Sequence, residues 1–192
     1  MSRPRWRNLS GGPNASGALR EAKDGPLNGD YFRRLARYNA WANRRLYEAC
    51  GRLAPEDYFA SRPSFFGSIH RTLNHILVAD RIWLGRLEGR PSGVSALDQV
   101  LFADFASLRA ARIEEDARIL AFVNGLSDAA LGTTLSYRNM AGEAKETPLV
   151  WVLAHIFNHQ THHRGQVHGM LSGTAVAPPP LDLLYFLPED RG

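Results

Sequence analysis

The sequence contains little cysteine, little lysine and no long apolar run. Its single cysteine, Cys50, cannot form an internal disulfide, which is typical of proteins in the reducing cytoplasm. We expect Cys50 to be a small buried side chain at a helix end rather than a nucleophile. No stretch reaches the roughly 18 apolar residues that a membrane-spanning helix needs, and no apolar segment of the signal-peptide kind follows Met1. We therefore expect a soluble cytoplasmic protein with no membrane partner.

The positive charge is carried almost entirely by arginine, because Lys23 and Lys145 are the only lysines among 23 basic residues. The arginines are spread along the chain without a dense run, so we expect no nucleic-acid partner. A chain of 192 residues with 44% hydrophobic content can bury one core. Residues 1–28 are too polar and too rich in glycine to join that core. We predict a mobile tail over 1–28, a single domain over 29–187 and a short C-terminal tail over 188–192.

Apolar residues recur at spacings of three and four in four stretches, which predicts four long amphipathic helices. Asp30 and Thr147 are the predicted N-caps of the first and fourth helices, and Gly51 and Gly125 are the predicted ends of the first and third. The four helices are expected over residues 30–50, 64–89, 98–124 and 147–173. The side chains expected in the core or at helix interfaces include Tyr31, Phe65, Ile113, Trp41, Trp83 and Trp151.

Two shorter segments complete the predicted architecture. Residues 133–147 have β-prone ends around Asn139 and Gly142, which predicts a short hairpin between the third and fourth helices. Residues 178–187 are expected to pack on the bundle as an apolar flap or a single helical turn. The pattern as a whole predicts an all-α fold, a four-helix bundle with a hairpin or irregular segment before the last helix.

Residues 155–163 hold four of the seven histidines, inside the predicted fourth helix. His159 and His163 stand one turn apart on one face, so their imidazoles could bind one ion. Transition metals usually take at least three protein ligands, and His75, on the flank of the second helix, is the leading candidate for the third. The spacing predicts a metal site made of these three histidines, although each is also compatible with a structural role.

Neighbouring polar residues leave alternatives open. His155 also lies one turn from His159 and is a rival ligand, whereas we expect His162 to be exposed or to support a ligand. The side chains that could accept a hydrogen bond from the remaining ring N–H of a ligand imidazole are Asn158, Gln160 and Gln166. These three residues could equally be ordinary polar residues on the protein surface.

Three separated blocks of the sequence resemble one known family. The blocks are residues 38–43 (YNAWAN), 68–83 and 155–166, and their order and spacing are similar to those of the DinB family over about residues 29–187. The resemblance implies a four-helix bundle of the DinB/YfiT-like class with a divalent ion held by three histidines. By position these ligands are His75, His159 and His163. The expected ion is zinc, with nickel as the alternative. The resemblance also implies a homodimer.

Three neutral imidazoles leave the ion its full positive charge, so it would acidify a bound water or bind a thiolate. Members of the wider superfamily are thiol-dependent transferases or isomerases. The resemblance therefore implies an enzyme that activates a low-molecular-weight thiol against a small electrophilic substrate, with His162, Asn158 or Arg164 nearby to orient it. The alternatives are a metal-dependent hydrolase and a non-catalytic, stress-related metal-binding or interaction module. A fourth protein ligand would favour a structural site, and an open position would favour an enzyme.

Overall fold

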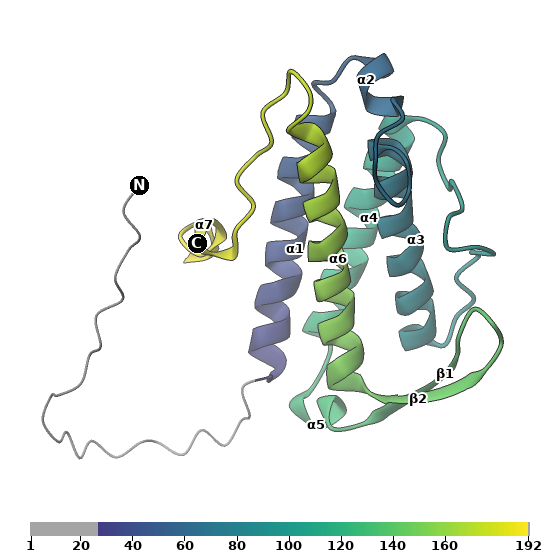
Figure 1. Cartoon of the computed structure of the whole chain (residues 1–192). Coiled ribbons are helices and arrows are strands. Elements are labelled where there is room, and N and C mark those ends of the chain that lie inside the picture. Colours follow the sequence, from purple (N-terminus) through teal and green to yellow (C-terminus); the bar gives the residue numbers. More distant parts are fainter. Residues whose placement is uncertain (1–26, 192) are drawn as a thin grey trace, which may run out of the picture.

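The computed structural model describes residues 27–191, in which four long helices lie side by side along a common direction (Figure 1). α1 packs against α4 and α6, and α3 packs against the same two helices, so the four close into a ring in the order α1, α4, α3, α6. The all-α four-helix bundle predicted from periodicity is confirmed. Most of the predicted 1–28 tail lies outside the described residues. The long helices are α1 (Gly29–Cys50), α3 (Ile69–Glu88), α4 (Phe105–Asn124) and α6 (Leu149–Leu171).

Short elements join and flank these helices. The predicted hairpin is present, formed by the antiparallel strands β1 (Thr134–Arg138) and β2 (Ala144–Pro148) next to the lower end of α6 in Figure 1. The C-terminal segment crosses to α1, where the Phe186 ring packs on Tyr38 and Trp41. The remaining short elements are α2 (Pro55–Phe59), α5 (Asp128–Leu131), α7 (Leu183–Phe186) and a 3₁₀ turn over Glu189–Arg191.

The predicted start of the second long helix at residue 64 is wrong. Gly67 has a φ of 77°, a left-handed conformation that no helix continues through, and the Ser68 side chain then caps α3 by accepting from the Arg71 amide. Phe65 therefore precedes the helix and is 85% exposed instead of lying on the core stripe. This difference matters for the site, because it leaves residues 60–68 as a loop beside α6.

Three other helix starts also differ from expectation. Asn28, rather than Asp30, caps α1. The third long helix begins near residue 105 instead of 98, because the Asp104 carboxylate accepts from the Ser107 amide and makes a better cap. Thr147 pairs with Leu135 within the hairpin and is not a cap. The helix ends at Gly51 and Gly125 are confirmed, as is the burial of Cys50 at the end of α1.

Besides Phe65, two predicted core side chains are largely in solvent. Ile113 is 61% exposed and Trp151 is 60% exposed. The physical reason for the first is that the buried face of α4 carries Arg112, Glu115 and Asp116 among its apolar residues, so apolar spacing alone indicates the wrong face. Tyr31 is also exposed.

A buried polar network runs through the centre of the bundle and contacts all four long helices. Asp80 on α3 accepts from Arg112 on α4 and from Gln160 on α6. Arg164 on α6 donates to Asn39 on α1. Its members, all buried, are Asn39, Asn43, Asp80, Arg112, Asp116, Gln160 and Arg164. Within residues 27–191, no helix combines the length and the apolar character needed to cross a bilayer.

Candidate metal centre

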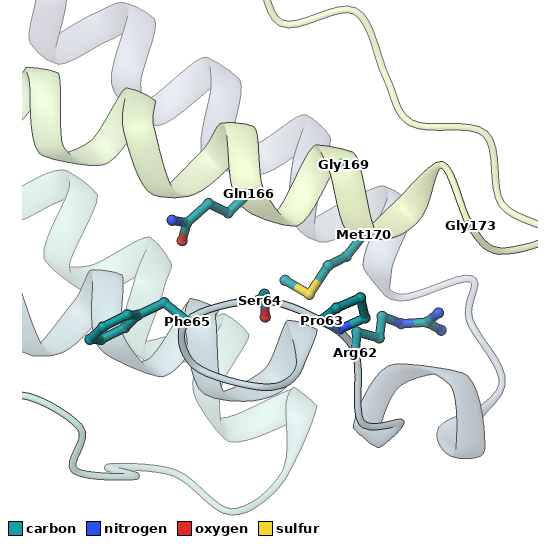
Figure 2. Close-up of a pocket in the computed structure, with 8 residues that line it drawn as sticks. All are labelled: Arg62, Pro63, Ser64, Phe65, Gln166, Gly169, Met170 and Gly173. Atoms are coloured by element: carbon teal, nitrogen blue, oxygen red, sulfur yellow. The ribbon is translucent and has the colours of Figure 1, made fainter.

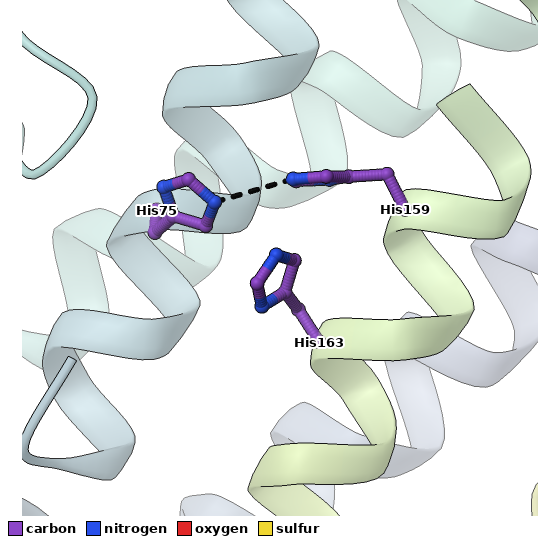
Figure 3. A group of neighbouring side chains, drawn as sticks. All are labelled: His75, His159 and His163. Atoms are coloured by element: carbon purple, nitrogen blue, oxygen red, sulfur yellow. Dashed lines mark hydrogen bonds between the residues drawn. The ribbon is translucent and has the colours of Figure 1, made fainter. Parts of the chain in front are cut away.

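Three histidines from two helices meet in the groove between α3 and α6 (Figure 3). His75 comes from α3, and His159 and His163 come from successive turns of α6. One ring nitrogen from each lies within 4.8 Å of the other two. The Nε2 atoms of His75 and His159 are 3.2 Å apart. The structure therefore brings together the three histidines that the sequence singled out as ligands.

Two of the three rings are held by a hydrogen bond from Nδ1, the ring nitrogen that points away from the other histidines, to an oxygen acceptor. His75 Nδ1 lies 2.8 Å from the Leu97 carbonyl oxygen, and His163 Nδ1 lies 2.8 Å from Gln166 Oε1. Both contacts place the proton on Nδ1, because a carbonyl or amide oxygen can only accept. The Nε2 atoms of these two rings are then left with free lone pairs that point into the space between the helices.

The separation between two of these nitrogens fits a tetrahedral transition metal. Zinc–imidazole bonds of about 2.0–2.1 Å in tetrahedral geometry place neighbouring ligand nitrogens about 3.3 Å apart. The Nε2–Nε2 separation of 3.2 Å between His75 and His159 matches that value. The donor set therefore suits a divalent ion that accepts imidazole nitrogen.

The electrostatics of the cluster keep the imidazoles neutral and available. Burial, followed by the charges that His163, His75 and other nearby histidines would carry, lowers the pKa of His159 to about 3. Burial also lowers the pKa values of His75 and His163. A metal does not have to displace protons from this site at neutral pH.

One aromatic side chain from the loop before α3 covers part of the centre. The Phe66 ring stacks on His75 with the centroids 4.0 Å apart and meets His163 nearly edge-on at 5.6 Å. The turn at Gly67 directs Phe66 onto the histidines while Phe65 remains in solvent. One side of the centre is thus apolar and shielded from water.

The rival ligands take other positions. His155 is exposed, packs edge-on against Trp83, and has its ring centre 5.7 Å from that of His159. His162 is exposed, and its Nε2 lies 3.2 Å from Gln166 Nε2. Neither belongs to the three-histidine cluster.

The supporting residues predicted from the sequence are partly right. Gln166 holds His163 as expected. Gln160 and Arg164 belong instead to the buried polar network, so Arg164 is not placed to orient a thiol. Asn158 is exposed.

Two contributors were missed by sequence reasoning. The Leu97 carbonyl belongs to a loop, and a backbone acceptor leaves no mark on the residue type. Phe66 did carry a signal, because a glycine directly follows the Phe65-Phe66 pair and indicates a turn at that point. That signal was hidden by assigning the segment to a helix.

A pocket of about 490 Å³ adjoins the centre along α6 (Figure 2). Gln166 connects the two, since it lines the pocket and also accepts from His163. The Arg62 Nε and Ser64 Oγ atoms in the wall are buried and have no hydrogen-bond partner in the part of the chain that the structure describes. The pocket is lined by Arg62, Pro63, Ser64, Phe65, Gln166, Gly169, Met170 and Gly173.

Comparison with known proteins identifies the family and agrees with the fold. Protein DinB of Bacillus subtilis (strain 168) is 27% identical over 164 residues, which cover 82% of this chain and 94% of that protein. The crystal structure of a DinB-like protein from Bacillus cereus ATCC 10987 shares the fold, with a TM-score of 0.57 at 17% identity over 73% of this chain and 90% of that chain. The model of the DinB family matches residues 26–191. The chain therefore belongs to the DinB family.

Proposed function

We propose that this protein is a metal-dependent transferase that joins a low-molecular-weight thiol to a small electrophilic substrate. His75, His159 and His163 are the proposed ligands of a divalent transition metal. The observation that carries the proposal is the orientation of the rings. The Nδ1 atoms of His75 and His163 each have a hydrogen-bond acceptor, and the Nε2 atoms of His75 and His159 lie 3.2 Å apart. We propose zinc as the resident ion, with nickel as the alternative.

An open coordination position favours an enzyme over a purely structural site. His155 and His162, the two residues that could have closed the site as fourth ligands, lie outside the cluster. His75, His159 and His163 would hold the ion as three neutral imidazoles, and its positive charge would lower the pKa of a bound thiol. The sulfur then forms a bond to the electrophilic carbon, the thiol proton goes to solvent, and the leaving group departs with its bonding electron pair.

The side chains around the ligands have defined parts in this proposal. Gln166 and the Leu97 carbonyl hold two ligand rings in position. Phe66 excludes water from one side, which strengthens electrostatic interactions at the centre. The adjoining pocket would take the body of the thiol, and a polar group on that body would complete the unpaired Arg62 and Ser64 atoms.

The test is a steady-state assay with a panel of low-molecular-weight thiols and a chromogenic electrophile. We expect turnover that requires both thiol and metal, is lost on chelation and returns when zinc or nickel is added. Replacing His163 by alanine should abolish it. Turnover that is indifferent to chelation would contradict the proposal, and product formed from water instead of thiol would identify a hydrolase.

Two further expectations belong to the proposal. The homodimer rests on the family resemblance, and the cytoplasmic location rests on the single cysteine of the sequence. We propose that the protein acts as a homodimer in the cytoplasm. Sedimentation equilibrium of the full chain measures the oligomeric state, and cell fractionation measures the location. A monomer at all concentrations would contradict the homodimer.

A further inference from the structure

A second cavity lies between α1 and α4, on the side of the bundle across from the metal centre. Its volume is about 340 Å³. A single water occupies about 30 Å³ in the liquid, so the space is large enough for a small organic molecule. It shares no residue with the centre or with the pocket beside it. Its lining includes Ala40, Tyr47, Arg112, Ile113, Ala117 and Leu120.

The buried part of this cavity presents donors without partners. Among residues 27–191, the buried Tyr47 hydroxyl and Arg112 Nε have no hydrogen-bond partner. Arg112 is only 2% exposed, with one terminal nitrogen bonded to Asp80 and the other 3.0 Å from Asp116. Burial raises the pKa of Tyr47, so the hydroxyl keeps its proton and remains a donor. Buried donors are normally paired, so these two call for an acceptor.

The rest of the cavity is apolar, with charge at its mouth. Ala40 on α1 and Ala117 on α4 line it with short side chains, and Ile113 and Leu120 line it as well. Arg44, Glu48 and Arg109 are exposed lining residues and form the mouth. A ligand that fits this distribution has an apolar body and one acceptor group at its end.

The charges around the cavity favour an anion. Its lining holds three arginines, Arg44, Arg109 and Arg112, and two carboxylates, Glu48 and Asp116. Two further charges contact this lining, namely Asp80 on Arg112 and Arg164 on Asn43. These two opposite charges offset each other, so the three guanidinium groups of the lining exceed its two carboxylates by one, and one bound anion balances that excess. The Asp116 carboxylate is itself engaged, since it accepts from Asn43 at 2.9 Å.

We propose that the α1–α4 cavity is a binding site for a small amphipathic carboxylate, whose oxygens accept from Tyr47 Oη and Arg112 Nε while its apolar body lies against Ile113 and Leu120. This site is separate from the proposed metal chemistry. It would allow an organic acid to bind next to the buried polar network.

The experiment is a calorimetric titration of the full chain with benzoate, phenylacetate and hexanoate, each compared with its uncharged amide. We expect saturable binding of at least one acid and about tenfold weaker binding of the matching amide, since a hydrogen bond to a charged group is worth more than a neutral one. Each titration is repeated after chelation. Unchanged binding distinguishes this site from coordination of the acid by a metal at the three histidines.

Two variants test the location. Tyr47→Phe removes an unpaired hydroxyl and should weaken acid binding about tenfold. Ala117→Leu fills the cavity from an exposed position of α4 and should abolish binding. Ala110→Leu makes the same change at an exposed position of α4 outside the cavity, and should leave binding unchanged. The proposal is overturned if no acid binds saturably, if chelation abolishes binding, or if Ala117→Leu binds like the wild type.

Discussion

Replacing Gln166 by leucine tests how the metal centre is held together. The Gln166 amide oxygen lies 2.8 Å from His163 Nδ1, and this contact fixes the tautomer that leaves Nε2 free for a metal. Without the acceptor, the ring can carry its proton on Nε2, and that proton competes with the metal. Loss of such a supporting contact typically lowers metal affinity by 10-fold to 100-fold, or about 1.4–2.7 kcal/mol.

The structure places the expected loss near the lower end of that range. The contact is only partly buried, and Gln166 faces a pocket of about 490 Å³. Water can therefore enter and accept from His163 in place of the amide. We expect about tenfold weaker binding for Gln166→Leu.

The assay is a competition titration of the metal against a chromophoric chelator, with a melting curve of each variant to verify folding. His162→Ala is the matched control, because His162 contacts the amide nitrogen of Gln166 and its removal leaves the oxygen bonded to His163. We expect less than about a threefold change for the control. The reasoning is refuted if Gln166→Leu binds metal as tightly as the wild type, or if the control loses as much.

Three more predictions follow from the buried groups. His159→Ala should reduce the metal content of untagged protein to near zero by elemental analysis, because two ligands rarely complete a site. Because the pKa of His159 is lowered from 6.5 to about 3, the unfolded chain takes up that proton first. The free energy of unfolding of the metal-free protein should therefore be unaffected by His159 above pH 6.5 and should fall as the pH is lowered from 6.5 to 3, as measured by urea unfolding. Asp80→Ala leaves the buried Arg112 without one partner and should cost about 3–5 kcal/mol of unfolding free energy in urea. Wild-type metal content in His159→Ala would contradict the first expectation, and a pH-independent urea midpoint would contradict the second. A loss of unfolding free energy below about 1 kcal/mol in Asp80→Ala would contradict the third.

Helix number and order were predictable because the long helices bury apolar residues at regular spacing. The residues at which these helices start were not predictable, because a single polar or glycine residue determines where each helix begins. Gly67 and Ser68 start α3 five residues later than the apolar pattern indicates. The orientation of α4 was hidden for a related reason, since Arg112 and Asp116 occupy core positions that the pattern assigns to apolar residues.

The candidate site combines residues that are close together in the sequence with residues that only the fold brings together. His159 and His163 are fixed relative to each other by one helical turn, so spacing alone brings them together. His75 reaches them only because α3 packs on α6. Its place on the flank of the second helix made it the leading candidate for the third ligand, and the resemblance pointed to the same residue. The acceptor at Leu97 and the ring of Phe66 come from loops, whose paths depend on the finished fold.

The same turns of α6 serve the metal centre and the buried polar network. His159 and His163 point to the groove with α3, whereas the adjacent residues Gln160 and Arg164 are rotated by about 100° and lie in the bundle interior. Gln160 donates to Asp80 on α3, so this bond fixes the rotation of α6 against the helix that carries the third ligand. A helix that turns about its axis moves its ligand nitrogens away from that third imidazole. Asp80→Ala should therefore weaken metal binding as well as folding, and unchanged metal affinity in the folded variant would show that the two faces of α6 are independent.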